Sequence, residues 1–273
     1  MITLMSCSPS GSTWERDVER IVVLPDTQCY SLFYPGIFHS QGRFAARLAE
    51  RSSVFHLVHV GDITDLNSHA EWEVARSALG PVTDIISPTL VTGNHDLGPG
   101  GSAADRTTLL DEYFSNLYFE STFDESIQNS ASLVGDDWLV VGLEFAPRPE
   151  VLDWANAVIA DHPDRFVLIA THAYLFEEGR RYDSASQPYH PSDYVVGDEG
   201  AAQIEPFGEL VDPHRLFRSG ILDRDQDQVL SRRQVGKARE QGAGGLQAAA
   251  EGEIIVEEAA KHPVSILVEQ LGF

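Results

Sequence analysis

Four short apolar runs in this chain each end in a cluster of acidic, amide or imidazole residues. The runs, expected to be buried strands, are residues 21–24, 54–60, 89–91 and 166–170. The clusters that follow them are Asp26-Thr27-Gln28, Gly61-Asp62, Gly93-Asn94-His95-Asp96 and Thr171-His172. In open α/β sheets, ligands bind at the carboxyl ends of the strands. The four clusters are therefore expected to converge on one site.

Segments with helical spacing of apolar residues lie between these runs. We expect helices within residues 40–52, 68–79, 107–117 and 150–160. Two further apolar segments flank Gly135-Asp136-Asp137, which predicts a β-hairpin. Repeated βα units favour a largely parallel sheet covered by helices, and the hairpin makes the sheet mixed. The predicted fold class is therefore α/β.

The chain has 273 residues, which is long enough for one large domain or two small ones. Its composition changes near residue 218. Residues 218–272 contain no aromatic side chain, whereas aromatics are frequent before them, and both lysines of the chain fall in this stretch. We predict a flexible leader over residues 1–19, one domain over residues 20–217 and a divergent tail over residues 218–273.

Charge and targeting signals limit the partners. A formal net charge of -23 disfavours nucleic acid and anionic membrane as general partners. No apolar run approaches the roughly 18 residues of a transmembrane helix. The chain as written is expected to be cytoplasmic. Residues 4–7 resemble the end of a lipoprotein signal, so an exported lipoprotein anchored at Cys7 is the alternative if the start is truncated.

The clusters offer a mixed set of oxygen and nitrogen donors. Asp26 and Asp62 supply carboxylates, Asn94 a carboxamide oxygen and His172 an imidazole. Such a set suits manganese, iron or zinc and lacks the thiolates of structural zinc. Two ions about 3.5–4 Å apart share a bridging ligand, activate water and stabilise displacement at phosphorus. The sequence therefore indicates a metal site for phosphoester chemistry.

Several further residues have an expected place. A cationic His95 would stabilise phosphoryl charge and protonate the leaving oxygen, with the adjacent Asp96 orienting it. Asp65 is expected to accept hydrogen bonds beside the ligands or in a turn. The histidines of the second run, His56 and His59, are expected to be core residues, and His190 is expected to lie on the surface.

These motifs resemble the calcineurin-like metallophosphoesterases, over roughly residues 20–218. Leu24-Pro25-Asp26-Thr27-Gln28 is similar to a branch in which glutamine replaces the usual histidine of the first motif. The resemblance implies a two-sheet β-sandwich of mixed strands flanked by helices. It also implies metal-dependent hydrolysis of a phosphate mono- or diester by metal-activated water.

The resemblance implies a role for each motif residue. Asp26 would bind a first metal ion with Gln28 beside it as a ligand or hydrogen-bond donor, and Asp62 would bridge two ions. Asn94 and His172 would bind the second ion. His95 would contact the phosphate and protonate the leaving group, supported by Asp96. The implied cofactors are two divalent ions of manganese, iron or zinc, and the implied partner is a phosphoester.

One motif of that family is missing from this sequence. No Gly-His-x-His follows His172, and Ser219-Gly220-Ile221 stands where Ser-Gly-His is expected. Three interpretations stay open. Other ligands such as His190 or His214 complete the site, or the protein is a catalytically impaired relative with a binding or regulatory role, or the sequence is altered after Gly220. We expect weak or single-metal binding unless the tail adds ligands.

Overall fold

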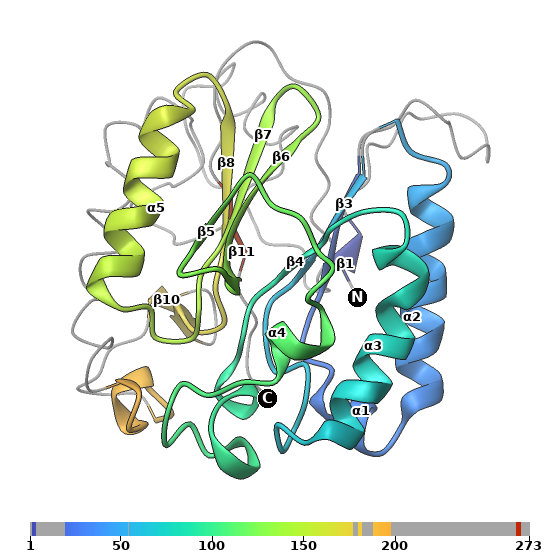
Figure 1. Ribbon diagram of the computed structural model, residues 1–273, viewed down its shortest axis with the longest axis vertical. Helices are drawn as coiled ribbons and strands as arrows, with labels where there is room; N and C mark the ends of the chain where they lie inside the picture. The colour runs from blue at the N-terminus through green and yellow to red at the C-terminus, as the bar shows by residue number, and fades with distance from the viewer. Residues whose placement is uncertain are drawn as a thin grey trace.

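Two β-sheets pack face to face with helices on their outer sides (Figure 1). The computed structural model describes residues 2–3, 20–53, 55–176, 180–181, 188–197 and 266–268. Helices α2 and α3 cover the first sheet, and α5 covers the second. This arrangement confirms the α/β sandwich predicted from the sequence.

The first sheet aligns the ends of three parallel strands. Its order is β1-β2-β3-β4, with bounds Ile2–Thr3, Arg20–Leu24, Phe55–His59 and Thr89–Leu90. Strand β1 is antiparallel to β2, and the other pairs are parallel. Leu24 pairs with His59, and His59 pairs with Leu90. The segments that follow these strands therefore all leave the sheet at the carboxyl ends of the strands.

The second sheet contains the predicted hairpin. Its order is β11-β8-β7-β6-β5, with bounds Ile266–Val268, Phe166–Ala170, Trp138–Gly142, Ser126–Val134 and Ser121–Phe123. Strands β6 and β7 are antiparallel, joined across the Val134–Trp138 pair, whereas β7, β8 and β11 are parallel. A separate pair, β9 (Leu175–Phe176) and β10 (Arg180–Arg181), follows β8.

The helices differ from the sequence-based expectation mainly at their ends. They are α1 (Gln28–Leu32), α2 (Pro35–Ala49), α3 (His69–Thr83), α4 (Leu110–Tyr113) and α5 (Pro149–Asp161). Helix α2 begins earlier than expected because Pro35 fits the first helical turn, where its missing N–H costs nothing. Helix α3 starts at a capping box formed by Ser68 and Glu71. Helix α1, which has only 5 residues, was not expected.

Among the described residues, apolar clusters hold these layers together. The first lies between the first sheet and helices α2 and α3, and includes Phe38 and Trp72. The second joins the second sheet to α5. A smaller cluster contains Leu97, Phe145 and Ala173, which lie in the loops that follow β4, β7 and β8. Burial of each large apolar side chain contributes roughly 1.5–3 kcal/mol, so the strand ends are held on a rigid base.

The predicted domain boundaries remain predictions. Ile2 and Thr3 of the expected leader form β1, and Ile266–Val268 of the expected tail form β11. Cys7, His214, Phe217 and Gly220 lie outside the described residues. Within the described part of the chain, no helix has the length and apolar character needed to cross a membrane.

Candidate active site

Asp62 lies where the four sequence clusters meet. Its Oδ1 accepts a hydrogen bond from the backbone N–H of His95 at 3.0 Å. Its Oδ2 lies 3.3 Å from Nε2 of Gln28 and 3.4 Å from Nε2 of His172. Asp62 is 4% exposed. Each of the other three clusters therefore contacts Asp62, and the expected convergence is confirmed.

Two motif glycines make this close approach possible. A Cβ atom on Gly93 would lie 2.0 Å from Oδ1 of Asp62, so a larger residue there would displace the carboxylate. Gly61 has a φ of +97°, and Asp62 itself has a φ of 48°, which is uncommon for a residue other than glycine. The Gly-Asp turn thus holds an unusual backbone conformation at the candidate site, as functional turns often do.

Gln28 joins the two carboxylates of the site. Its backbone N–H donates to Oδ1 of Asp26 at 2.8 Å, and its Nε2 donates to Oδ2 of Asp26 at 2.8 Å. The same Nε2 is the group that lies near Asp62. Burial first, and then the charge of Asp62, raise the pKa of Asp26 to about 6. A cation bound beside the two neighbouring carboxylates would offset the repulsion between them.

His172 is oriented as a metal-binding imidazole commonly is. Its Nδ1 donates to the carbonyl oxygen of Val60 at 2.9 Å, which directs Nε2 toward Asp62. Burial lowers the pKa of His172, but the charge of Asp62 and the hydrogen bonds outweigh it and raise the pKa to about 9. Burial raises the pKa of Asp62, yet His172 and His95 bring it below its ordinary value. The two side chains therefore lie within ion-pair distance, with opposite effects on each other's pKa.

His95 is held by Asp65. Its Nδ1 lies 2.9 Å from the backbone oxygen of Asp65 and 3.5 Å from Oδ1 of the same residue. The imidazole is 36% exposed, so the ring is open to a ligand on one side. Asp65 thus occupies the position beside the site that the sequence favoured for it, as a hydrogen-bond acceptor.

The expected contact between Asp96 and His95 is wrong. Asp96 is fully buried, and its Oδ1 accepts hydrogen bonds from the backbone N–H and the hydroxyl of Thr64 at 2.8 and 2.9 Å. Its Oδ2 accepts from the backbone N–H groups of Ile63 and Gly93 at 3.0 and 2.9 Å. Residues 94–96 form the 3₁₀ turn η1, in which adjacent side chains point in different directions. Asp96 therefore braces the motif loops.

Asn94 also lies in η1 and is half-buried. Among the described residues, its carboxamide has no hydrogen-bond partner. A carboxamide left unbonded beside the candidate site is available to a ligand. Its role as a metal ligand remains a prediction.

The structure also tests the places expected for His56, His59 and His190. His56 and His59 are buried and bond to the hydroxyls of Thr89 and Thr27, which confirms that they are core residues. The surface position expected for His190 is wrong, because this residue is 5% exposed. Its Nδ1 accepts the backbone N–H of Ser192 and begins the turn η4 (Pro191–Asp193). The short His-Pro-Ser-Asp sequence is the only signal of this capping role.

The donor chemistry fits a divalent ion. Carboxylate oxygens of Asp26 and Asp62 and the imidazole of His172 are suitable ligands for manganese, iron or zinc. Nevertheless, no three His, Cys, Asp or Glu side chains of the described residues gather closely enough to be recognised as a metal site. Asp62 lies beside His172, and Nε2 of Gln28 bonds the carboxylates of both Asp26 and Asp62.

A buried ion-pair network supports the neighbouring loop. Glu144 follows β7, is 1% exposed, and accepts hydrogen bonds from Arg106 at 3.1 Å and Arg148 at 2.8 Å. Its backbone N–H and its Oε2 also bond the side chain of Asn129. Arg106 and Asn129 are far from Glu144 in sequence, and the network was not predicted because no local pattern links them to it.

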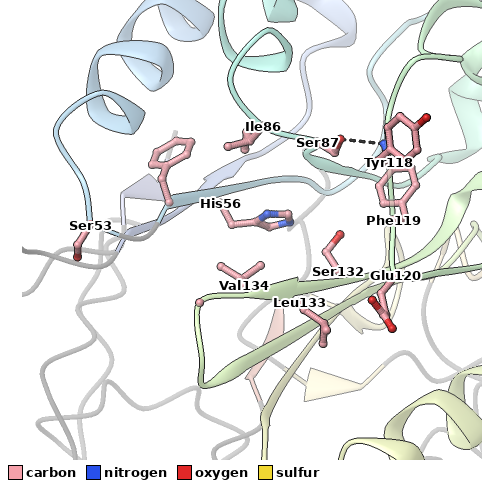
Figure 2. Close-up of a pocket in the computed structure, with 12 residues that line it drawn as sticks. Ser53, His56, Ile86, Ser87, Tyr118, Phe119, Glu120, Ser132, Leu133 and Val134 are labelled. Carbon is pink, nitrogen blue, oxygen red and sulfur yellow. Dashed lines mark hydrogen bonds between the residues drawn. The ribbon is translucent and has the colours of Figure 1, made fainter.

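A pocket of about 580 Å³ lies away from this site (Figure 2). Phe55 and His56 at the beginning of β3 line it, together with the end of β6. His56 lies near the beginning of β3, whereas Asp62 follows its opposite end. None of its described lining residues is a lysine or arginine. The pocket is therefore distinct from the candidate active site.

Comparison with known proteins assigns a family. The sequence model of the family described as calcineurin-like phosphoesterase matches residues 19–209. The uncharacterized protein YvnB of Bacillus subtilis (strain 168) is 27% identical over 176 residues, which are 61% of this chain and 13% of that protein. The chain thus spans a small part of that relative's length. Because the family match covers most of its residues, the chain belongs to the calcineurin-like phosphoesterase family.

Proposed function

We propose that this chain hydrolyses a phosphate mono- or diester with the help of divalent metal ions. The observation that carries the proposal is the position of Asp62, whose carboxylate contacts His95, Gln28 and His172 together. Membership of the phosphoesterase family supports the same reaction class. A central carboxylate with both oxygens available to neighbours is suited to bridge two cations.

The chain offers ligands for two ions. We assign Asp26 and Gln28 to one ion, Asn94 and His172 to the other, and Asp62 to both. When bound, such ions supply an activated water nucleophile and stabilise charge on the phosphoryl oxygens. The hydrogen bond from Nδ1 of His172 to Val60 keeps Nε2 as the binding atom.

His95 is the proposed proton donor to the leaving oxygen. Its Nδ1 is bonded to Asp65, which leaves Nε2 as the nitrogen that can reach a substrate. Oδ1 of Asp65 lies 3.5 Å from the same Nδ1, so a carboxylate stands beside the proposed donor. A protonated imidazole can donate its proton as the bond from phosphorus to the leaving oxygen breaks.

A second candidate function is phosphoester binding without turnover. Two observations favour it: the printed sequence lacks Gly-His-x-His after His172, and the described residues hold no close trio of metal-binding side chains. Fewer ligands lower metal affinity, and a weakly held ion activates water poorly. The same loops could then bind a phosphoester and release it unchanged.

Hydrolysis assays distinguish the two candidates. The full chain, supplied with manganese, is assayed on p-nitrophenyl phosphate and bis(p-nitrophenyl) phosphate, beside Asp62→Asn and the exposed control Asp84→Asn. We expect hydrolysis by the wild type and by Asp84→Asn, and loss in Asp62→Asn. A folded wild type that binds phosphate but turns over neither ester favours the binding function.

A further inference from the structure

A short segment far along the chain is fixed beside the candidate active site. Residues 188–197 approach the loop after β7, and one guanidinium joins them. Nη2 of Arg106 donates to the backbone oxygens of Ala146 and Val196, each at 2.9 Å. The backbone N–H of Val196 also donates to the oxygen of Ala103 at 3.3 Å. These bonds set the position of the segment relative to the site.

Tyr194 of this segment contacts Phe145, and Phe145 contacts His172. The ring of Tyr194 meets that of Phe145 edge to face, with centroids 5.4 Å apart. Phe145 in turn meets the imidazole of His172, with centroids 5.9 Å apart. Phe145 is 1% exposed, whereas Tyr194 is only partly buried. Of the two rings, Tyr194 is therefore the one that a ligand can touch.

Apolar packing fixes Tyr194 against the motif loops themselves. It packs on the small cluster that contains Leu97 and Ala173. Leu97 directly follows Asp96, and Ala173 directly follows His172. Because the cluster joins residues next to two motifs, the phenol ring has a defined place relative to both.

The electrostatic surroundings keep the Tyr194 hydroxyl protonated. Burial first, and then the negative charge of Asp62, raise the pKa of Tyr194 above its ordinary value. A neutral phenol is a hydrogen-bond donor that adds no charge of its own. In a site that already contains Asp26, Asp62 and Asp65, such a donor is suited to an anionic ligand.

We propose that Tyr194 is a substrate-binding residue, whose hydroxyl donates a hydrogen bond to a non-bridging oxygen of the phosphoryl group held beside Asp62. This assignment rests on the proposed phosphoester function of the same site. It adds a donor from residues 188–197 to the motif residues His95 and Asn94. The donor meets the substrate from the side of the loop after β7, where Phe145 supports its ring.

The test compares two tyrosines of the same segment. Tyr194→Phe removes the proposed donor and keeps the ring contact with Phe145, whereas Tyr189→Phe changes a tyrosine that is 71% exposed. Inorganic phosphate is titrated into the full chain by calorimetry in the presence of manganese, and kcat and KM are measured with p-nitrophenyl phosphate. We expect Tyr194→Phe to weaken phosphate binding and lower kcat/KM by about 10- to 100-fold. Tyr189→Phe should match the wild type, and both variants should keep its melting temperature.

The outcomes separate this inference from the proposed function. An active wild type whose phosphate affinity and kcat/KM are unchanged by Tyr194→Phe overturns the assignment of Tyr194 alone. An inactive wild type whose phosphate binding still weakens in Tyr194→Phe supports Tyr194 as a binding residue and overturns the hydrolytic function. A wild type that neither binds phosphate nor hydrolyses the ester overturns both.

Discussion

The imidazole of His95 is bonded to Asp65, which precedes it by 30 positions, rather than to its sequence neighbour Asp96. Nδ1 of His95 lies 2.9 Å from the backbone oxygen and 3.5 Å from the carboxylate of Asp65. The carbonyl fixes the ring, and the carboxylate adds a negative charge beside it. Asp65 is therefore the residue that positions the proposed acid.

Replacing Asp65 by asparagine should slow turnover. The change removes the negative charge beside Nδ1 but keeps the backbone carbonyl, so the ring stays in place and only the nearby carboxylate is lost. We expect kcat to fall by about 10- to 100-fold, with the larger loss for esters with poor leaving groups, since these depend most on the acid. The measurement is kcat across a series of aryl phosphates. A loss independent of the leaving group would argue against the acid role, and Asp84→Asn serves as the exposed control.

Replacing Asp96 by asparagine should instead destabilise the fold. The carboxylate accepts four hydrogen bonds, and an amide has only one oxygen with which to accept them. Burial, followed by the charge of Asp62, raises the pKa of Asp96 to about 7, so unfolding is measured at about pH 8, above that value. We expect urea denaturation to show a loss of about 2–4 kcal/mol in the free energy of unfolding. A loss below about 0.5 kcal/mol would mean that the loops do not depend on this brace.

Buried histidines should make the fold sensitive to acid. Burial lowers the pKa of His56 to about 4 from 6.5. Below pH 6.5 the unfolded chain therefore binds a proton that the folded chain does not, and stability falls as the pH falls from 6.5 toward 4. His56 contributes at most about 3 kcal/mol to this loss.

The contribution of His56 is measured by urea denaturation between pH 7 and pH 4.5. His56→Gln, which keeps a neutral hydrogen-bonding group near Thr89, should show a shallower dependence of stability on pH. His69→Gln changes a histidine whose side chain is 64% exposed and should leave the slope unchanged. Equal slopes for all three proteins would contradict a neutral, buried His56.

The sequence predicted the layout of the site better than its contacts. The convergence on Asp62 followed from the order of the motifs, because parallel strands align their carboxyl ends. The hydrogen-bond partner of His95 could not be predicted from the sequence. The 3₁₀ turn of residues 94–96 directs the side chain of Asp96 away from His95. The roles of Tyr194 and Arg106 could not be predicted either, because their contacts join segments that only the folded chain brings together. Likewise, the burial of His190 did not follow from the sequence, which places it in a polar segment with Pro191 and Ser192.

The most direct test of a metal site centred on Asp62 is the metal content per folded chain. Wild type and Asp62→Asn are purified without chelator, reloaded with manganese, freed of unbound ions and measured by elemental analysis, with circular dichroism as the check on folding. We predict at least one manganese ion per wild-type chain and a clear loss in Asp62→Asn, which keeps the shape of the side chain and tolerates the left-handed backbone at this position. Equal manganese content in the two folded proteins, or none in the folded wild type, would contradict the account.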